Sequence, residues 1–187
     1  MPLYYLRGGM GINIDNNVAG AERNTTATVS YNYWIPINKT SLFSIGASAG
    51  IIQKSLDGTL LRTPEGTLID GVYTDHNDGA LPAVAVSSMS PTFNIGLYFR
   101  NERIEAGLSV NNLTEPRINL DFDSGSADIL INRNYFLTLG FNFDIGSSWT
   151  VLPSVFAQSD LVQTELHFST IIQHNDNIFG GVSFRGY

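Results

Sequence analysis

Residues 92–112 read TFNIGLYFRNERIEAGLSVNN, and this stretch decides the fold class. Apolar side chains alternate with small polar ones on both sides of a short charged turn. The apolar positions are Phe93, Ile95, Leu97 and Phe99 before the turn, and Ile104, Ala106, Leu108 and Val110 after it. A period of two is typical of β-strands, because successive side chains point to opposite faces. The stretch therefore predicts two antiparallel strands, 92–100 and 103–112.

Seven further segments show the same alternation, so the sequence predicts nine strands. They cover residues 4–14, 25–37, 42–53, 134–145, 149–158, 161–173 and 177–185. No stretch has the i, i+3, i+4, i+7 apolar spacing of an amphipathic helix. Most segments exceed the length of about 5–6 residues of ordinary strands and reach the roughly 9–11 residues that cross a bilayer. The chain is therefore expected to be all-β.

Charged residues within these segments fall only among the Gly, Ser, Thr and Asn positions. Charged residues make up 14% of the chain, against about 25% in a typical soluble domain. An Arg or Lys facing lipid near the bilayer midplane costs roughly 2–4 kcal/mol. An antiparallel transmembrane β-barrel explains both patterns, because its apolar phase faces lipid and its polar phase faces inward. The inward-facing residues singled out are Arg7, Trp34, Tyr98, Glu105, Asp144, Phe156, Glu165, His167 and Arg185.

The connections between the predicted strands alternate in length. Residues 15–24, 54–91 and 113–133 form long links, and the links between them are short. Outer-membrane barrels place long loops outside and short turns in the periplasm. The pattern therefore predicts an outer-membrane location, with residues 54–91 forming either a long extracellular loop or a plug.

The predicted strand number is odd, whereas single-chain bacterial barrels have an even number. An unpaired strand edge in the bilayer would leave backbone groups without hydrogen-bond partners. We therefore expect that residues 1–187 form one barrel domain that is a fragment of a larger closed barrel, or that further strands come from elsewhere.

Neither composition nor motif spacing favours a cofactor, a metal or catalysis. The chain has no cysteine, and its net charge of −7 argues against nucleic-acid binding. Two acidic clusters, Asp57 to Asp78 and Asp121 to Asp128, lack the spacing of an EF-hand calcium loop. Glu165, His167 and Ser169 share one strand face and supply the residue types of a hydrolase triad, but i, i+2 neighbours on a strand rarely reach its geometry. A polar network is the preferred interpretation, and no enzymatic activity is expected.

Four stretches, in order along the chain, resemble the PorP/SprF family of type IX secretion system outer-membrane proteins from Bacteroidota. They are SIGASAG at 44–50, PTFNIGLYFRNERIEAGLSVNNL at 91–113, NYFLTLGF at 134–141 with LPS at 152–154, and GGVSFR at 180–185. Phe184 replaces a tyrosine of the family pattern. Members of this family continue with further strands at both ends, so the resemblance implies that residues 1–187 lack both N-terminal and C-terminal strands of the barrel.

The resemblance implies a non-catalytic partner of secreted surface adhesins, associated with the type IX machinery, outer-membrane lipid and gliding motility. Such a protein would bind the adhesin's C-terminal sorting domain and hold it at the cell surface. Candidate contacts are the apolar residues of the predicted loop 54–91: Leu56, Leu60, Leu61, Leu68, Ile69, Val72 and Tyr73. The alternatives are a porin for small solutes, a barrel hydrolase and a soluble β-domain.

Overall fold

The computed structural model of the chain consists almost entirely of β-strands. It describes residues 2–3, 7–64, 66–69, 72–75, 81–122, 125–175 and 177–186. Within these ranges the single helical element is the short 3₁₀ turn η2 (Gly58–Leu60), and no helix there is long and apolar enough to cross a membrane. The all-β prediction is therefore confirmed.

Nine long strands form the main sheet and match the nine predicted segments one by one. They are β2 (Gly8–Ala19), β3 (Glu22–Pro36), β4 (Leu42–Asp57), β7 (Ala85–Arg100), β8 (Ile104–Asn111), β11 (Asn134–Phe141) with β12 (Phe143–Ile145), β13 (Trp149–Ser159), β14 (Thr164–His174) and β15 (Ile178–Gly186). A short strand, β1 (Pro2–Leu3), pairs with the start of β2. Successive long strands pair antiparallel, so the sheet order follows the chain from β1 to β15. Within the described residues no pairing joins the two ends of this path.

The prediction of a long loop at residues 15–24 is wrong. β2 and β3 continue to Ala19 and Glu22, and the turn Gly20–Ala21 joins them. Gly20 has a φ of +60°, a conformation that glycine adopts without steric cost. The alternation of apolar and polar residues does not detect these strand ends, because residues 15–17 and 22–24 are polar in both phases. β4 and β7 are also longer than predicted, so the link predicted at 54–91 narrows to residues 58–84.

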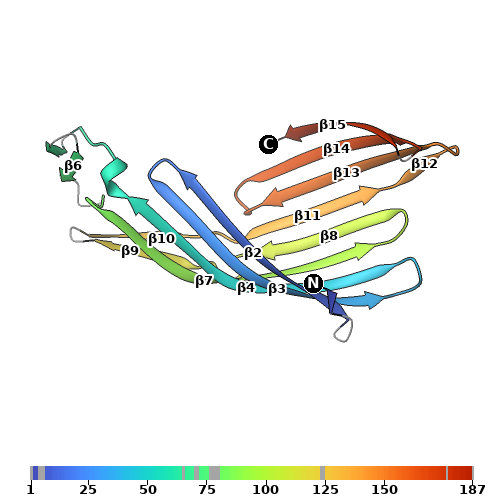
Figure 1. The fold of residues 1–187 in the computed structure, drawn as a ribbon, viewed down its shortest axis with the longest axis horizontal. Coiled ribbons are helices and arrows are strands. Elements are labelled where there is room, and N and C mark those ends of the chain that lie inside the picture. Colours follow the sequence, from blue (N-terminus) through green and yellow to red (C-terminus); the bar gives the residue numbers. More distant parts are fainter. Residues whose placement is uncertain are drawn as a thin grey trace.

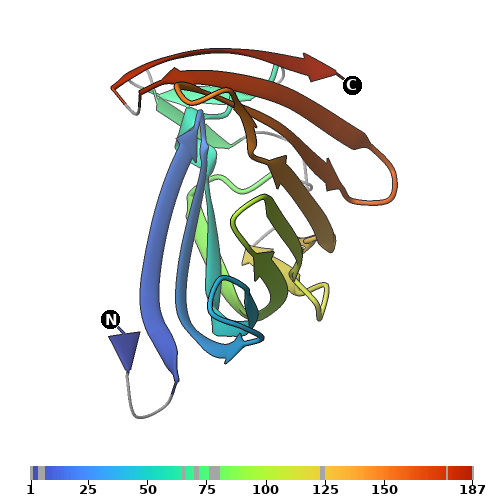
Figure 2. The same ribbon diagram turned by 90° about the vertical axis from the view of Figure 1, so that its right-hand side faces the viewer.

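The sheet is strongly curved (Figure 2). Its two faces differ in polarity. We call the face with Gly, Ser, Thr and Asn the inner face, because its residues are the less exposed ones. On β4 and β7, Ser44, Ile52 and Thr92 are buried on the inner face, whereas Ile45, Ile51 and Phe93 on the outer face are 45–48% exposed. Among the described residues, three hydrophobic side chains are buried and 36 large ones are exposed. This arrangement is the inverse of a soluble core, so the outer face requires apolar surroundings.

The apolar surface of the outer face ends along a row of residues paired across four strands. The last fully apolar row contains Ile14, Ala27, Ile51 and Pro91, and the next row contains Asn16, Thr25, Gln53 and Met89. Thr25 Oγ1 donates a hydrogen bond to Asn16 Oδ1 over 3.1 Å in this second row. Beyond it the outer side of β3 and β4 carries Arg23, Ser55 and Asp57. The first four strands therefore extend past the apolar band.

Both long links lie at one end of the sheet (Figure 1). Residues 58–84 contain η2, β5 (Thr67–Ile69) and β6 (Val72–Asp75), and residues 112–133 contain β9 (Arg117–Phe122) and β10 (Gly125–Leu130). The turns at 20–21 and 160–163 belong to the same end, which we call the long-loop end. The opposite, short-turn end carries the links 37–41, 101–103, 146–148 and 175–177.

A small hydrophobic core lies between the β9–β10 hairpin and the main sheet. Ile118 and Leu120 of β9 are 0% and 1% exposed and cluster with Ile52 of β4. The partly buried residues around them are Leu56, Val86, Ala127, Ile129 and Ile131. Because Ile52, Leu56 and Val86 lie in the inner phase of β4 and β7, the hairpin covers the inner face at the long-loop end. The segment predicted as a plain link at 113–133 is therefore a packed hairpin.

Candidate functional site: the inner face and the long-loop end

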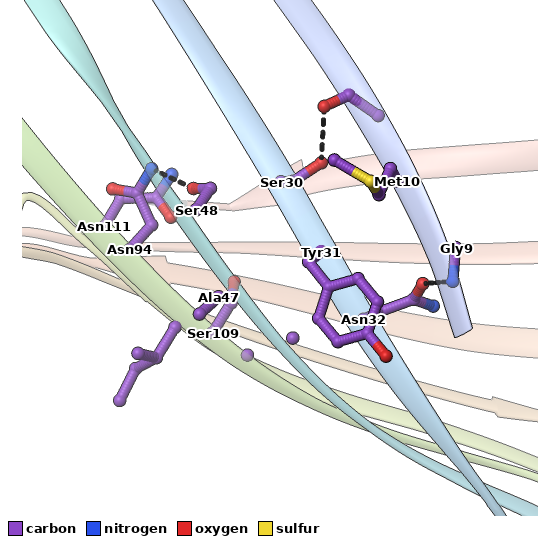
Figure 3. A pocket seen from close by; sticks show the side chains of 14 residues that line it. Gly9, Met10, Ser30, Tyr31, Asn32, Ala47, Ser48, Asn94, Ser109 and Asn111 are labelled. Atoms are coloured by element: carbon purple, nitrogen blue, oxygen red, sulfur yellow. Dashed lines mark hydrogen bonds between the residues drawn. The ribbon is translucent and has the colours of Figure 1, made fainter. Parts of the chain in front are cut away.

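Three cavities of about 510, 480 and 470 Å³ lie along the inner face. The first, which we call the central cavity, lies against β2, β3, β4, β7 and β8 (Figure 3). The second, the aromatic cavity, is bounded by Tyr98, Phe136 and Phe156. The third, the asparagine cavity, lies between the strands and the base of the β9–β10 hairpin. Polar and small side chains dominate the inward-facing part of all three walls.

Side-chain amides fix the walls of the central and asparagine cavities. Asn94 Nδ2 donates to Ser48 Oγ over 2.8 Å, and Asn94 Oδ1 accepts from the backbone N–H of Asn112 over 2.9 Å. The buried Thr92 hydroxyl donates to Asn112 Oδ1 over 3.0 Å. Asn32 Oδ1 accepts from the backbone N–H of Gly9 over 2.8 Å. These bonds cross between strands, so they hold the inner face in one arrangement.

The predicted inward-facing residues at the short-turn end occupy the inner phase, with one exception. The Tyr98 hydroxyl donates to Glu105 across the β7–β8 pair, and Asp144 Oδ1 accepts from Thr150 Oγ1 over 3.0 Å. Trp34 lies in the inner phase of β3. Arg7 is the exception, because it lies in the turn before β2 with a φ of +47°.

The remaining predicted residues form a network on β13, β14 and β15. Arg185 Nη2 lies 2.8 Å from Glu165 Oε2, and His167 Nε2 lies 3.7 Å from the same oxygen. The Phe156 ring meets the His167 ring edge to face, with 5.6 Å between centroids. An ion pair and an aromatic–imidazole contact thus link these residues on the same face of the sheet.

The hydrolase set predicted from Glu165, His167 and Ser169 is not brought together as a triad. The Ser169 hydroxyl is hydrogen-bonded to the Ser183 hydroxyl of β15 over 2.9 Å. Glu165 is bound by Arg185, so its carboxylate is directed across the sheet. Alternation places all three residues on one face, but the hydroxyl finds its partner on the neighbouring strand rather than along its own.

The predicted partner-contact residues separate into two environments. Leu56 belongs to β4 and is half-buried beside the hairpin core, so it is not a loop residue. Leu60 and Ile69 are 61% and 57% exposed, and Leu61 follows η2 directly. Leu68, Val72 and Tyr73 lie in β5 and β6, but their side chains are outside the described residues. Among the predicted contact residues whose side chains are described, Leu60 and Ile69 are therefore the exposed ones.

The two acidic clusters are spread over several elements. Asp57 Oδ1 accepts from the backbone N–H of Thr59 over 3.1 Å and caps η2, while Asp121 and Asp128 lie on the β9–β10 hairpin. Asp70, His76, Asn77, Asp78 and Asp123 lie outside the described residues. Within the part of the chain that the structure describes, no three acidic or histidine side chains converge.

The asparagine cavity and the hairpin beside it are features that the strand pattern alone did not reveal. Asn24 and Lys54, which line this cavity, fall in segments predicted as loops. A signal for the hairpin was nevertheless present. Residues 117–122 alternate as RINLDF, and the apolar positions Ala127, Ile129 and Ile131 repeat with the same period after the DSG turn sequence.

Comparison with known proteins agrees with the exposed apolar outer face. No curated protein and no solved structure matches this chain. The model of one family, described as type IX secretion system membrane protein PorP/SprF, matches residues 2–187. A membrane protein explains why the outer face of the sheet can remain apolar without a covering layer. The chain therefore belongs to the PorP/SprF family of type IX secretion system membrane proteins.

Proposed function

We propose that this protein is a non-catalytic outer-membrane β-barrel that binds the C-terminal sorting domain of a secreted adhesin. In this role it assists export of the adhesin and anchors it at the cell surface. Two features together carry the proposal. The sheet exposes its apolar face, and both long links, with their additional strands, lie at one end of it. The family supplies the setting, which is type IX secretion across the membrane.

The apolar band has the dimensions expected for a strand that crosses an outer membrane. On β4 it runs from Phe43 to Ile51, which are eight positions and therefore about 27 Å apart along the strand. A strand tilt of about 40° reduces this to a height of about 20 Å, close to the roughly 25 Å apolar band of known barrels. The polar row at Asn16, Thr25 and Gln53 would then lie at the membrane surface.

The long-loop end supplies a platform suited to a protein partner. Outer-membrane barrels carry their longer loops on the extracellular side, which orients this end outward. The extended parts of β2, β3, β4 and β7 form a rigid base, and the β9–β10 hairpin packs against it. Recognition residues on a rigid scaffold lose little entropy on binding, and exposed apolar groups such as Leu60 and Ile69 favour a protein partner.

A porin for small solutes is the second candidate, favoured by the three cavities along the inner face. The β9–β10 hairpin argues against it, because this hairpin covers part of the inner face at the outward end.

Affinity purification from detergent-solubilised outer membranes tests the adhesin proposal. The wild-type protein is expected to recover a large secreted protein bound through its C-terminal domain. Changing the exposed apolar pair with Leu60→Asp and Ile69→Asp is expected to reduce recovery about tenfold or more, since roughly 1.4 kcal/mol of lost contact has that effect.

The matched control places two aspartates at the opposite end, with Thr40→Asp and Ser147→Asp in exposed short turns. This variant is expected to recover the partner as well as the wild type does. Equal loss in both variants, or recovery of no secreted protein by the wild type, would contradict the proposed function.

A further inference from the structure

The three cavities of the inner face form one continuous track. The central and asparagine cavities share Asn94 and Asn111, and the central and aromatic cavities share Asn32, Gly46, Gly96 and Ser109. On β4 the lining runs from Lys54 in the asparagine cavity to Ser44 in the aromatic cavity. These residues are ten positions apart, so the track is about 34 Å long. An elongated track of this length fits an extended polymer better than a compact small molecule.

The track is electrically neutral. Among the described residues, Lys54 is the only charged side chain in the three linings, and its ammonium group lies 2.6 Å from Glu22 Oε1. The other polar groups are amides and hydroxyls, mainly of Asn, Ser and Thr. A neutral wall of this kind offers no compensation for the desolvation of an ionic ligand. The occupant is therefore expected to be neutral and rich in hydrogen-bonding groups.

Several amide groups in the track have unused hydrogen-bonding capacity. Within the described residues, the side chains of Asn13, Asn24 and Asn111 have no hydrogen-bond partner, and Asn24 Oδ1 is buried without one. A buried polar atom without a partner costs about 1–3 kcal/mol. Each asparagine side chain offers two donors and one acceptor, which complement the C=O and N–H of a peptide unit. In the part of the chain that the structure describes, no aromatic side chain lines the asparagine cavity, so a ring there has no flat surface on which to stack.

Glycines keep the middle of the track open. A Cβ added at Gly46 would meet no heavy atom closer than 3.7 Å, and one added at Gly96 none closer than 3.4 Å. These are ordinary contact distances, so packing between strands does not require glycine at either position. A side chain there would instead occupy the track. Small residues at such positions allow another backbone to approach closely.

We propose that this inner track binds an extended, neutral polypeptide segment through its main chain. The segment would span about ten residues, because an extended chain advances about 3.4 Å per residue. Recognition through peptide units tolerates many side-chain sequences, provided that the side chains are small and uncharged. The identification of the segment as part of the secreted partner rests on the proposed function, whereas the peptide chemistry rests on the cavities alone.

Single-cysteine chemistry tests the track directly, because the natural chain has no cysteine. The probe is a peptide of about ten alternating Ser and Gly residues, matching the track length, with an activated disulfide at one end. Its reaction rate is measured in purified, folded protein at Asn111→Cys in the track and at Ser169→Cys on the same face outside it. Each rate is divided by that of a small neutral activated disulfide, which corrects for thiol accessibility.

The corrected rate is expected to be about tenfold or more higher at Asn111→Cys, which corresponds to about 1.4 kcal/mol of local binding. Adding Gly46→Leu to fill the track is expected to abolish this preference. Asn24→Leu is expected to weaken it while removing an unpaired buried oxygen, so this second variant keeps the test informative if Gly46→Leu does not fold.

Equal corrected rates at the two cysteines would overturn the proposal. Protection of Asn111→Cys by a neutral malto-oligosaccharide, but not by unlabelled Ser-Gly peptide, would also overturn it by identifying a glycan as the occupant. Failure of this test is distinguishable from failure of the proposed function. The affinity purification can still recover the secreted partner through the long-loop end when the track shows no peptide preference.

Discussion

At the scale of single residues, neighbouring positions on one strand have opposite environments. Thr92 is 1% exposed and bonded to Asn112, whereas Phe93 beside it is 45% exposed. Asn94 bonds to Ser48 and to the backbone of Asn112, whereas Ile95 is again exposed. Polar side chains therefore satisfy each other on the inner face, and apolar side chains are left for lipid. Substitutions at adjacent positions should consequently have very different effects.

Leu108 and Ser109 provide a matched pair for this expectation. Leu108 is 48% exposed on the outer face, and Ser109 lines the central and aromatic cavities. Leu108→Arg is expected to reduce the free energy of unfolding in lipid vesicles by roughly 2–4 kcal/mol, because it places a charge in the apolar band. Ser109→Arg is expected to reduce it less than Leu108→Arg does, because its guanidinium meets amide and hydroxyl groups of the inner face instead of lipid. Denaturant titration of both variants measures the difference, and equal losses would contradict the assigned faces.

Asp160 in the β13–β14 turn predicts a local pH dependence. The backbone N–H groups of Gln163 and Val162 donate to its carboxylate over 2.7 and 3.0 Å, and these bonds lower the pKa of Asp160. A group with a lowered folded pKa contributes stability above its unfolded pKa and loses it as the pH falls through its folded pKa. The turn is therefore expected to loosen only when the pH falls below the range in which an ordinary aspartate carboxyl group titrates. Carboxyl NMR titration, compared with a peptide of residues 158–164, should give the lower midpoint in the folded protein, and equal midpoints would refute this.

At the scale of elements, the sequence pattern predicts the long strands well and their extensions poorly. The alternation of apolar and polar residues in the membrane band identifies all nine strands. Beyond Ile14 and Ile51 the outer phase becomes polar, as at Asn16 and Gln53, so the apolar alternation is lost although the backbone pairing continues. The inner phase of the site was also predictable from alternation. The cavities were not, because they depend on cross-strand register and on a hairpin that packs back onto the sheet.

The β9–β10 hairpin should be held in place mainly by Ile118 and Leu120. Ile118→Ala removes a buried side chain at 0% exposure, and such a change costs about 2–5 kcal/mol. Because the hairpin contacts the sheet at one small core, this loss is expected to release the hairpin rather than unfold the sheet. Trypsin should then cleave after Arg117 or Arg133 about tenfold faster or more.

The exposed neighbour Asp121 provides the control, since Asp121→Ala leaves the core intact. This variant is expected to be cleaved at the wild-type rate. Unchanged cleavage of Ile118→Ala would show that the hairpin is held by other contacts.

At the scale of the whole molecule, the two faces of the sheet differ in polarity and its two ends differ in the length of their links. The outer face is apolar and exposed, the inner face carries the track, and the long-loop end carries a packed platform. The low charge content of 14% follows from this division, because a lipid-facing surface excludes charge and the track is built from amides and hydroxyls. A protein partner at the platform and a peptide in the track are compatible with the same architecture.

Planar-bilayer recording separates the anchor from a porin. With the β9–β10 hairpin covering the inner face at the long-loop end, the protein is expected to show no large steady current. Replacing residues 117–130 by a short Gly-Ser turn should raise the conductance, because the cover is removed. A large steady current through the unchanged protein would favour solute transport.

The central claim is that the apolar phase of the sheet faces lipid and the polar phase faces inward. Nitroxide labels on single cysteines at Ile95, Leu97 and Leu108, and at Gly96 and Ser109, test it in lipid vesicles. The first group is expected to be accessible to oxygen and shielded from a water-soluble nickel chelate, and the second group is expected to show the opposite order. A period of two in accessibility along β7 and β8 is the predicted result. Equal access of the nickel chelate to both groups would contradict the account.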